Sequence, residues 1–203
     1  MSGPITIVSA GIGNMGSVRN MLRRLDSDAD ITSDPEVVRG ADKLILPGVG
    51  AFDAGMQALR AAKLDVAVRE AVDRGARLLG ICLGMQLLLD ASEEGNDAGL
   101  GLIRGRARRF VPSASLRVPH MGWNVVHPTR DSTLLSASPE EQRFYFVHSY
   151  YAEVDDPSDA AGMTTYGRDF VSVIERGRVL GAQFHLEKSH RFGMAMLKRF
   201  IDA

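Results

Sequence analysis

Short apolar runs alternate with amphipathic segments through the first half of the chain. Ile5–Ala10, Lys43–Leu46 and Arg77–Ile81 are mainly apolar and of strand length, which is typical of strands covered on both faces. Between and after them, apolar positions recur at helical spacing in the segments Ser17–Leu25, Ala54–Ala62, Asp65–Arg74 and Leu83 to about Ala91. This alternation predicts an α/β fold with a mainly parallel open sheet flanked by helices.

The second half of the chain, from about Arg106, has a different pattern. Arg143–Val154 is rich in aromatic and β-branched residues, which favour strands. Phe170–Glu175 and Arg178–Phe184 flank Arg176-Gly177 as two strands flank a hairpin turn. We therefore expect additional antiparallel strands at the edge of the sheet.

The end of the chain predicts a helix over Ser189–Ile201. Phe192, Met196 and Phe200 are spaced four residues apart there, so they share one face that packs on the core. A length of 203 residues suits one hydrophobic core, and we expect a single domain over residues 1–203.

Composition and charge exclude several classes of function. The formal net charge is −1, so no overall field draws this surface to nucleic acid or to a membrane. The longest apolar stretch, Leu78–Leu89, is about 12 residues, whereas a membrane helix needs about 20. There is one cysteine, so no internal disulfide forms, and the first residues lack the basic region of a secretory signal. We expect a cytoplasmic protein that binds neither nucleic acid nor membrane.

That cysteine lies in Gly80-Ile81-Cys82-Leu83-Gly84, between a predicted strand and a predicted helix. This is the thiol form of the nucleophile elbow, in which flanking glycines allow a sharp turn that exposes the nucleophile. The start of a helix favours a thiolate, and the N–H of Leu83 is placed to donate to an oxyanion. The alternative is a buried cysteine that packs as a small apolar residue.

A cysteine nucleophile needs a base, and the chain has five histidines. His185 ends a predicted strand, and Glu187 follows two residues later, where an extended chain directs both side chains to one side. The other four histidines are expected elsewhere: His120 and His127 in a loop, His148 as a structural residue in an aromatic strand, and His190 at the start of a helix. Spacing alone leaves open whether His185 is the base or is merely exposed.

Two other motifs compete for the function. Gly11-Ile12-Gly13-Asn14-Met15-Gly16 matches G-x-G-x-x-G between a strand and a helix, with Asp34 about 20 residues beyond, as in NAD-binding domains. His185-Leu186-Glu187 matches the H-x-E of zinc deaminases, but a chain with one cysteine lacks the P-C-x-x-C that this metal site requires. We therefore expect no metal, and the dinucleotide motif stays an alternative at this point.

Five longer segments resemble one known family: LILPGVGAFDAGM (44–56), GICLGMQLLLDASEEG (80–95), VPHMGWN (118–124), FYFVHSYY (144–151) and QFHLEKS (183–189). They are similar to the glutaminase subunits of imidazole glycerol phosphate synthases, which are class I glutamine amidotransferases. The resemblance runs from about residue 4 to the C-terminus, with the segments in the family's order. It assigns the glycine loop at Gly11–Gly16 to a family G-x-G-N segment, which disfavours dinucleotide binding.

The resemblance implies a role for each matching residue. It places a catalytic triad on Cys82, His185 and Glu187. It implies glutamine contacts at Gly48, Gly50, Leu83, Gln86, Glu94, Ser149 and Tyr150, and contacts with a partner subunit at Asn14, Met121, Trp123, Tyr145 and Lys188. The implied reaction is hydrolysis of L-glutamine through a cysteine thioester, without a cofactor. The ammonia then passes to a cyclase subunit, a (β/α)₈ barrel, in a heterodimer.

The chain departs from the family pattern at a few positions. Leu186 stands where the family usually has proline, and Ser9-Ala10 replaces an acidic-aromatic pair before the glycine loop. Because the triad is complete, we expect reduced rigidity at Leu186 rather than loss of activity. The run Lys188–Gly193 also resembles paralogues that supply ammonia to sugar-amidating enzymes of surface polysaccharides. A third hypothesis is a catalytically weakened scaffold that only binds its synthase partner.

Overall fold

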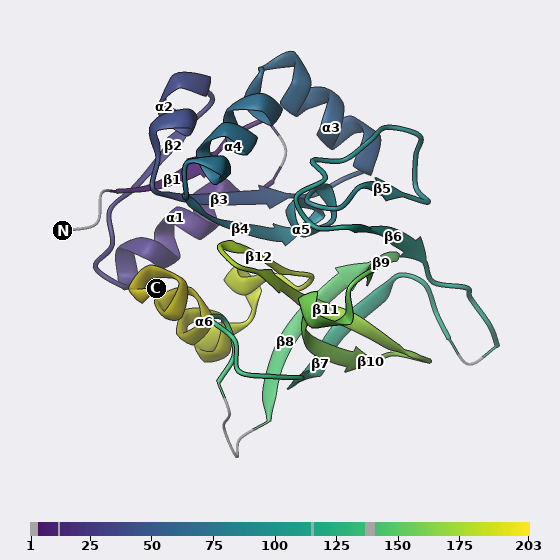
Figure 1. Ribbon diagram of the computed structural model, residues 1–203. Helices are drawn as coiled ribbons and strands as arrows, with labels where there is room; N and C mark the ends of the chain where they lie inside the picture. Colours follow the sequence, from purple (N-terminus) through teal and green to yellow (C-terminus); the bar gives the residue numbers. More distant parts are fainter. Residues whose placement is uncertain (1–3, 12, 115, 137–140) are drawn as a thin grey trace.

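A computed structural model describes residues 4–11, 13–114, 116–136 and 141–203 (Figure 1). The first half consists of β1 Ile5–Val8, α1 Met15–Arg24, β2 Ala29–Thr32, α2 Pro35–Gly40, β3 Lys43–Gly48, α3 Phe52–Ala61, α4 Leu64–Asp73, β4 Arg77–Cys82 and α5 Leu83–Leu87. The second half consists of β5 Ala91–Ser92, β6 Gly105–Arg109, β7 His120–Pro128, β8 Gln142–His148, β9 Tyr150–Val154, η1 Pro157–Asp159, β10 Ala160–Thr165, β11 Asp169–Arg176, β12 Val179–Ala182, η2 Leu186–Lys188 and α6 His190–Asp202. The two η elements are single turns of 3₁₀ helix.

The sheet joins a parallel half to an antiparallel half. β2, β1, β3, β4 and β12 lie side by side and parallel. β11, β10, β7 and β8 continue the sheet in antiparallel order. β9 also pairs with β11, β6 pairs with β9, and the short β5 pairs with β6. The predicted hairpin around Gly177 is the β11–β12 hairpin, so it connects the two halves. The predicted α/β fold with antiparallel strands beyond the parallel sheet is confirmed (Figure 1).

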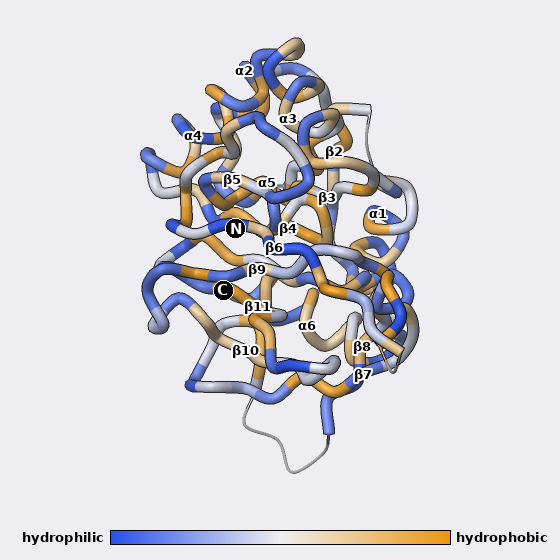
Figure 2. Tube along the Cα trace, turned by 90° about the vertical axis from the view of Figure 1, so that its right-hand side faces the viewer, coloured by the Kyte–Doolittle hydropathy of each residue, from blue (hydrophilic) through white to orange (hydrophobic). Residues whose placement is uncertain are grey.

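The two faces of the sheet bury separate hydrophobic cores. On one face, α1 and α6 pack against β1, with Leu22, Met196 and Phe200 fully or almost fully buried. On the other face, α3, α4 and α5 pack against β3 and β4, and Phe52 and Met56 are fully buried. Figure 2 shows the hydrophobic segments running through the interior, with hydrophilic segments in the outer loops. Helices therefore cover both faces of the parallel half, as the pattern of the first half predicted.

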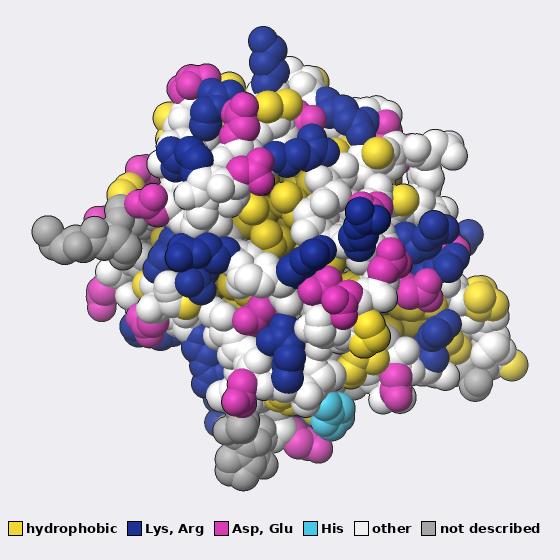
Figure 3. Space-filling view, in the orientation of Figure 1, with side chains coloured by type: hydrophobic (Ala, Val, Ile, Leu, Met, Phe, Trp, Pro, Cys, Tyr) yellow, Lys and Arg dark blue, Asp and Glu magenta, His cyan; other side chains and the backbone are white. Residues whose placement is uncertain are grey.

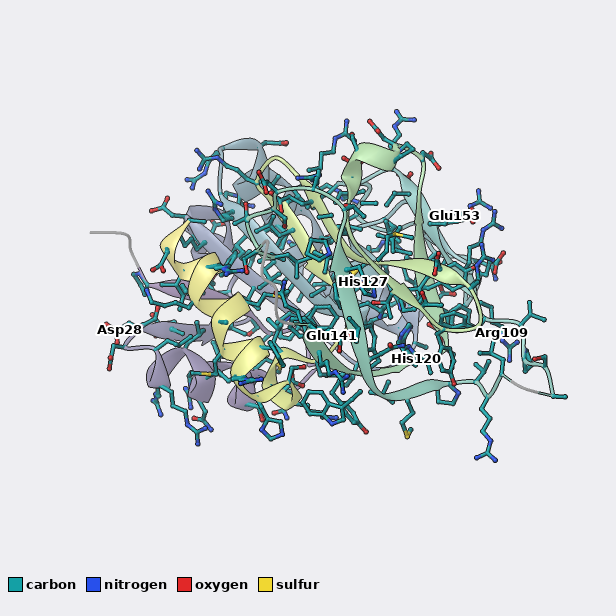
Figure 4. All side chains as sticks on the ribbon, turned by 90° about the horizontal axis from the view of Figure 1, so that it is seen from below. Asp28, Arg109, His120, His127, Glu141 and Glu153 are labelled. Carbon is teal, nitrogen blue, oxygen red and sulfur yellow. The ribbon has the colours of Figure 1, made fainter. Side chains whose placement is uncertain are left out.

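The prediction of a loop at His120 and His127 is wrong, because both residues belong to β7 (Figure 4). Along this strand His120 is buried, while the next apolar side chains, Met121 and Trp123, point outward. A strand with one buried face usually buries its apolar residues and exposes its polar ones, whereas here a polar residue is buried and apolar ones are exposed. The sequence pattern therefore does not predict this strand.

The helix that begins at Leu83 is also shorter than expected, since α5 ends at Leu87 rather than near Ala91. The carbonyl groups of Leu87, Leu88 and Leu89 accept hydrogen bonds from backbone N–H groups of the segment 100–103. These carbonyls are therefore not available to continue the helical ladder. A contact between distant segments ends the helix, although the local apolar sequence would extend it.

The surface of the described residues carries both signs of charge. On the face shown in Figure 3, Lys and Arg side chains are interspersed with Asp and Glu side chains. No helix in the described part of the chain is long and apolar enough to cross a membrane.

Candidate active site

Cys82 occupies a sharp turn between β4 and α5. Its backbone has φ 56° and ψ −114°, a conformation that residues other than glycine rarely adopt. A Cβ on Gly84 would lie 1.8 Å from the carbonyl oxygen of Leu46, and a Cβ on Gly80 would lie 2.6 Å from that of Gly84. Only glycine fits at either position, so the turn depends on both glycines. This is the steric reason for the G-x-C-x-G spacing.

The loop after β3 lies directly beside this turn. Gly48 pairs with Cys82 in the β3–β4 register, and a Cβ on Gly48 would lie 2.8 Å from the backbone nitrogen of Gly84. Gly50, which has φ 105°, lines a cavity together with Val49. Gly48 is absent from that lining, so the structure places it against the elbow rather than in the cavity.

His185 and Glu187 form a buried pair next to Cys82. The backbone N–H of His185 donates to the carbonyl of Tyr145 over 2.9 Å, which attaches this segment to β8. The ring Nδ1 of His185 lies 2.8 Å from Oε1 of Glu187, and the two side chains are only 5% and 7% exposed. Leu186 and Glu187 belong to the turn η2, which follows His185, rather than to the extended segment expected from the sequence. The pair is nevertheless on one side of the chain, as predicted.

The electrostatics of the site favour a proton on His185. Burial lowers the pKa of His185, but hydrogen bonds with Cys82 and Glu187 raise it more, to about 9. Burial raises the pKa of Glu187, but the hydrogen bond with His185 lowers it more, to below its ordinary range. At neutral pH the site therefore holds an imidazolium between a carboxylate and the cysteine sulfur.

A cavity of about 350 Å³ opens beside Cys82, which is one of its lining residues. It is lined by six of the seven residues that the resemblance assigned to glutamine, together with two of the three catalytic candidates: Gly50, Leu83, Gln86, Glu94, Ser149, Tyr150, Cys82 and His185. The sequence did not point to four other lining residues: Val49, Pro119, Val147 and His148. His148 was expected only as a structural histidine. Its place in the wall follows from the β7–β8 register, which pairs it with His120.

Two polar side chains of the cavity wall are held by hydrogen bonds. Gln86 is 4% exposed, and its Nε2 donates to the carbonyl of Tyr150 over 3.0 Å and to Oε1 of Gln183 over 3.0 Å. Oε2 of Glu94 accepts from the N–H of Phe52, the first residue of α3, over 2.8 Å. These contacts give the polar groups of the cavity fixed orientations.

Four of the five expected partner contacts gather beside the cavity. We call Met121, Trp123, Tyr145, Lys188 and His190 the aromatic patch. Trp123 stacks on His190 with centroids 5.4 Å apart, and Lys188 Nζ lies 5.7 Å from the centre of the Tyr145 ring. Met121 and Trp123 are 62% and 47% exposed. The fifth residue, Asn14, is at the start of α1, where its side chain accepts from the N–H of Ser17 over 3.2 Å.

The glycine loop before α1 packs against the active-site loop. A Cβ on Gly13 would lie 3.0 Å from the carbonyl oxygen of Pro47, whereas Ile12 of the same motif lies outside the described residues. Asp34, the candidate ribose ligand, instead caps α2 by accepting from the N–H of Glu36 over 2.9 Å. In the described ranges, no three His, Cys, Asp or Glu side chains form a group that could hold a metal ion.

Comparison with known proteins decides the family. Residues 7–203 match the family model described as glutamine amidotransferase class-I. The chain belongs to this amidotransferase family. The resemblance seen in the sequence is thereby confirmed.

Relatives within the amidotransferase family match nearly the whole chain. The chain is 45% identical to imidazole glycerol phosphate synthase subunit HisH 2 of Methanococcus maripaludis, covering 97% of this chain and 98% of the relative. It is 50% identical to imidazole glycerol phosphate synthase subunit HisH of Symbiobacterium thermophilum, covering 95% of this chain and 91% of the relative. Among solved structures, PurLQS from Thermotoga maritima superposes with a TM-score of 0.75 at 17% identity over 100% of this chain and 99% of that one. The structural match supports the amidotransferase fold alone.

Proposed function

We propose that this chain is the glutaminase subunit of an imidazole glycerol phosphate synthase, an enzyme of histidine biosynthesis. It hydrolyses L-glutamine to glutamate and ammonia, and it passes the ammonia to a cyclase subunit. Nearly full-length identity of 45% and 50% to proteins named as this subunit supports the assignment. The observation that carries the chemistry is Cys82 on a strained turn, beside both the buried pair of His185 and Glu187 and a cavity.

The reaction proceeds by acyl transfer through the cysteine. The thiolate of Cys82 attacks the side-chain amide carbon of glutamine, and the amide oxygen becomes an oxyanion. The N–H groups of Leu83 and of the loop at residues 47–50 stabilise that oxyanion. The imidazolium of His185 gives its proton to the leaving nitrogen, so that ammonia departs and a glutamyl thioester remains. His185 then takes a proton from water, whose oxygen attacks the thioester and releases glutamate and the thiolate.

The remaining groups of the cavity bind the substrate. Glu94 offers a carboxylate to the α-ammonium group of glutamine, and its bond to the N–H of Phe52 fixes its position. Gln86 and the backbone at Ser149 and Tyr150 supply hydrogen bonds along the wall. Glu187 orients the imidazole and stabilises its charged form. Gly48 supports the elbow by close packing.

The aromatic patch is the proposed contact with the cyclase subunit, with Asn14 as a further contact. Aromatic and Met side chains are enriched at protein interfaces, and the exposed Trp123 and Met121 provide them here, with the half-buried Tyr145 packed against Trp123. Free ammonia becomes protonated in neutral water and is then no longer a nucleophile, so transfer within a complex suits the chemistry. We propose a heterodimer with a (β/α)₈-barrel cyclase.

The other hypotheses have weaker support. The relatives described above are named as synthase subunits, which does not favour a sugar-amidating partner. Asp34 is used as a helix cap and the glycine loop packs on Pro47, so nothing favours a dinucleotide there. The complete buried pair of His185 and Glu187 argues against a scaffold without catalysis.

Glutamate release from glutamine tests the proposal. The chain is assayed alone and with a candidate cyclase plus that cyclase's ribonucleotide substrate, beside Cys82→Ala as control. We expect the cyclase and nucleotide to stimulate glutamate release, and Cys82→Ala to abolish it. Release that is unaffected by the cyclase would reject the synthase assignment, while release that survives in Cys82→Ala would reject the nucleophile.

A further inference from the structure

Three polar side chains form a continuous row from β7 to the wall of the cavity. Nδ2 of Asn124 lies 3.2 Å from Nε2 of His120, and Nδ1 of His120 lies 3.0 Å from Nε2 of His148. Nδ1 of His148 lies 2.7 Å from the carbonyl oxygen of Tyr150. We call this row the histidine relay. Neither histidine takes part in the proposed chemistry, although His148 lines the cavity.

Every hydrogen bond of the relay runs in one direction. The amide oxygen of Asn124 accepts from the N–H of Val125 over 2.8 Å, and its nitrogen donates to the carbonyl of Thr165 over 3.0 Å. The nitrogen facing His120 is therefore a donor, so Nε2 of His120 accepts and its Nδ1 carries the proton. His148 must then accept at Nε2 and donate from Nδ1 to Tyr150. The carbonyl oxygen of Tyr150 can only accept, so this last hydrogen bond independently requires the proton to be on Nδ1 of His148.

The relay needs both rings to be neutral, and their surroundings keep them so. His120 stacks between Phe146 and Tyr166, with centroid distances of 4.7 and 3.9 Å. Burial lowers the pKa of His120 to about 4, and burial in the first place lowers that of His148 to about 3. A doubly protonated ring at either position would leave one donor facing another donor.

The carbonyl at the end of the relay belongs to the substrate wall. It also accepts from Nε2 of Gln86 over 3.0 Å, and Ser149 and Tyr150 both line the cavity. We propose that His148, oriented by His120 and Asn124, is a positioning residue that holds the peptide of Tyr150 in place for glutamine. This inference rests on the proposed glutaminase function. It adds a hydrogen-bonded connection between that wall and β7, the strand that carries Met121 and Trp123.

Two substitutions of His148 separate hydrogen bonding from ring packing. In His148→Asn the side-chain amide nitrogen takes the place of Nδ1 and keeps the donor to Tyr150, but the ring is lost. In His148→Phe the ring keeps its contacts with Phe110 and Phe170, which lie 5.5 and 5.4 Å away, but the donor is lost. We expect His148→Phe to raise the KM for glutamine about tenfold with little change in kcat, and His148→Asn to raise it less than about threefold.

The opposite order of the two variants would overturn the inference, because it would mean that His148 acts by packing alone. Equal KM values in both variants would overturn it as well. His127→Asn serves as the matched control, since His127 is an exposed histidine on the same strand. Its KM and kcat should equal those of the unsubstituted chain.

A second measurement does not depend on catalysis. The ring ¹⁵N chemical shifts of His120 and His148 should both report the tautomer that carries hydrogen on Nδ1, and hydrogen on Nε2 of either ring would refute the relay. Asn124→Asp replaces the donor with an acceptor, so His120 should switch its proton to Nε2 and the KM should rise. If the unsubstituted chain releases no glutamate even with the cyclase and its ribonucleotide substrate, the proposed function fails, while the tautomers still test the relay itself.

Discussion

Replacing Glu187 with Gln removes one negative charge from the buried pair with little change of shape. The amide oxygen of Gln can still accept from Nδ1 of His185, over the distance of 2.8 Å that Oε1 spans now. Both side chains are almost fully buried, so water cannot compensate for the lost charge. The variant therefore tests what the charge of Glu187 does to His185.

The size of the effect follows from the pKa of His185. Its rise from 6.5 to about 9 corresponds to ~3.4 kcal/mol in favour of the imidazolium, which Cys82 and Glu187 provide together against the cost of burial. A hydrogen bond to a charged group contributes about 1.5–3 kcal/mol. Loss of the charge should therefore lower the pKa of His185 to about 7–8 and reduce glutamate release roughly 10–150-fold.

The same change alters how stability depends on pH. A raised pKa stabilises the folded chain fully below the unfolded value of 6.5, and this contribution is lost as the pH rises through about 9. Glu187→Gln lowers the pKa of His185 in the folded chain. The variant should therefore unfold with a lower free energy than the unsubstituted chain, and the part of this difference that comes from His185 should be fully present near pH 6 and should vanish above about pH 9.

NMR titration of the His185 ring in both chains measures the pKa directly, and urea unfolding at several pH values measures the difference in unfolding free energy. Glu153→Gln is the matched control, because Glu153 is an exposed carboxylate paired with Arg108 away from the cavity. A pKa of His185 that stays at about 9 in Glu187→Gln would refute the reasoning. The sulfur of Cys82 would then account for the raised pKa without Glu187.

Three further substitutions test the packing around the site. Gly84→Ala places a Cβ 1.8 Å from the carbonyl oxygen of Leu46, so we expect a loss of more than about 3 kcal/mol of unfolding free energy, measured in urea. Gly95→Ala places a Cβ 2.0 Å from Oδ1 of Asp53, whose carboxylate accepts from the N–H groups of Asn96 and Asp97 and so holds the turn after Glu94. Because Glu94 is the carboxylate proposed to bind glutamine, steady-state kinetics should show a raised KM with little change in kcat. Leu186→Pro puts proline at the first position of η2, where its fixed φ suits a helical turn, but the change also removes buried side-chain atoms. Because the two effects oppose each other, urea unfolding should give a free energy within about 1 kcal/mol of the unsubstituted chain, and glutamate release should be retained.

The sequence predicts those parts of the fold whose residues carry a local signal. Buried strands such as β4 are apolar throughout, and α6 begins at His190 and repeats its apolar residues at helical spacing. The elbow is readable because the glycines needed around Cys82 lie two residues to either side. These signals were sufficient for β1, β3 and β4 and for the catalytic candidates, whereas β2 was not predicted and β12 was expected only in an antiparallel hairpin.

Contacts between distant segments are what the sequence does not reveal. The outward Met121 and Trp123 conceal β7, and carbonyl groups that bond to the segment 100–103 end α5 early. The close packing of Gly48 against Gly84 depends on the β3–β4 register. The position of His148 in the cavity wall depends in the same way on the pairing of β7 with β8.

The tight packing of Gly48, Gly80 and Gly84 also bears on how such a chain can evolve. Around Cys82 there is no room for a side chain at these three positions, so nearly every substitution there would disrupt the turn. The outward side chains of β7 and β8 are under no such restriction. A descendant of this chain can therefore acquire a new recipient for its ammonia through surface changes, while it inherits the elbow unaltered.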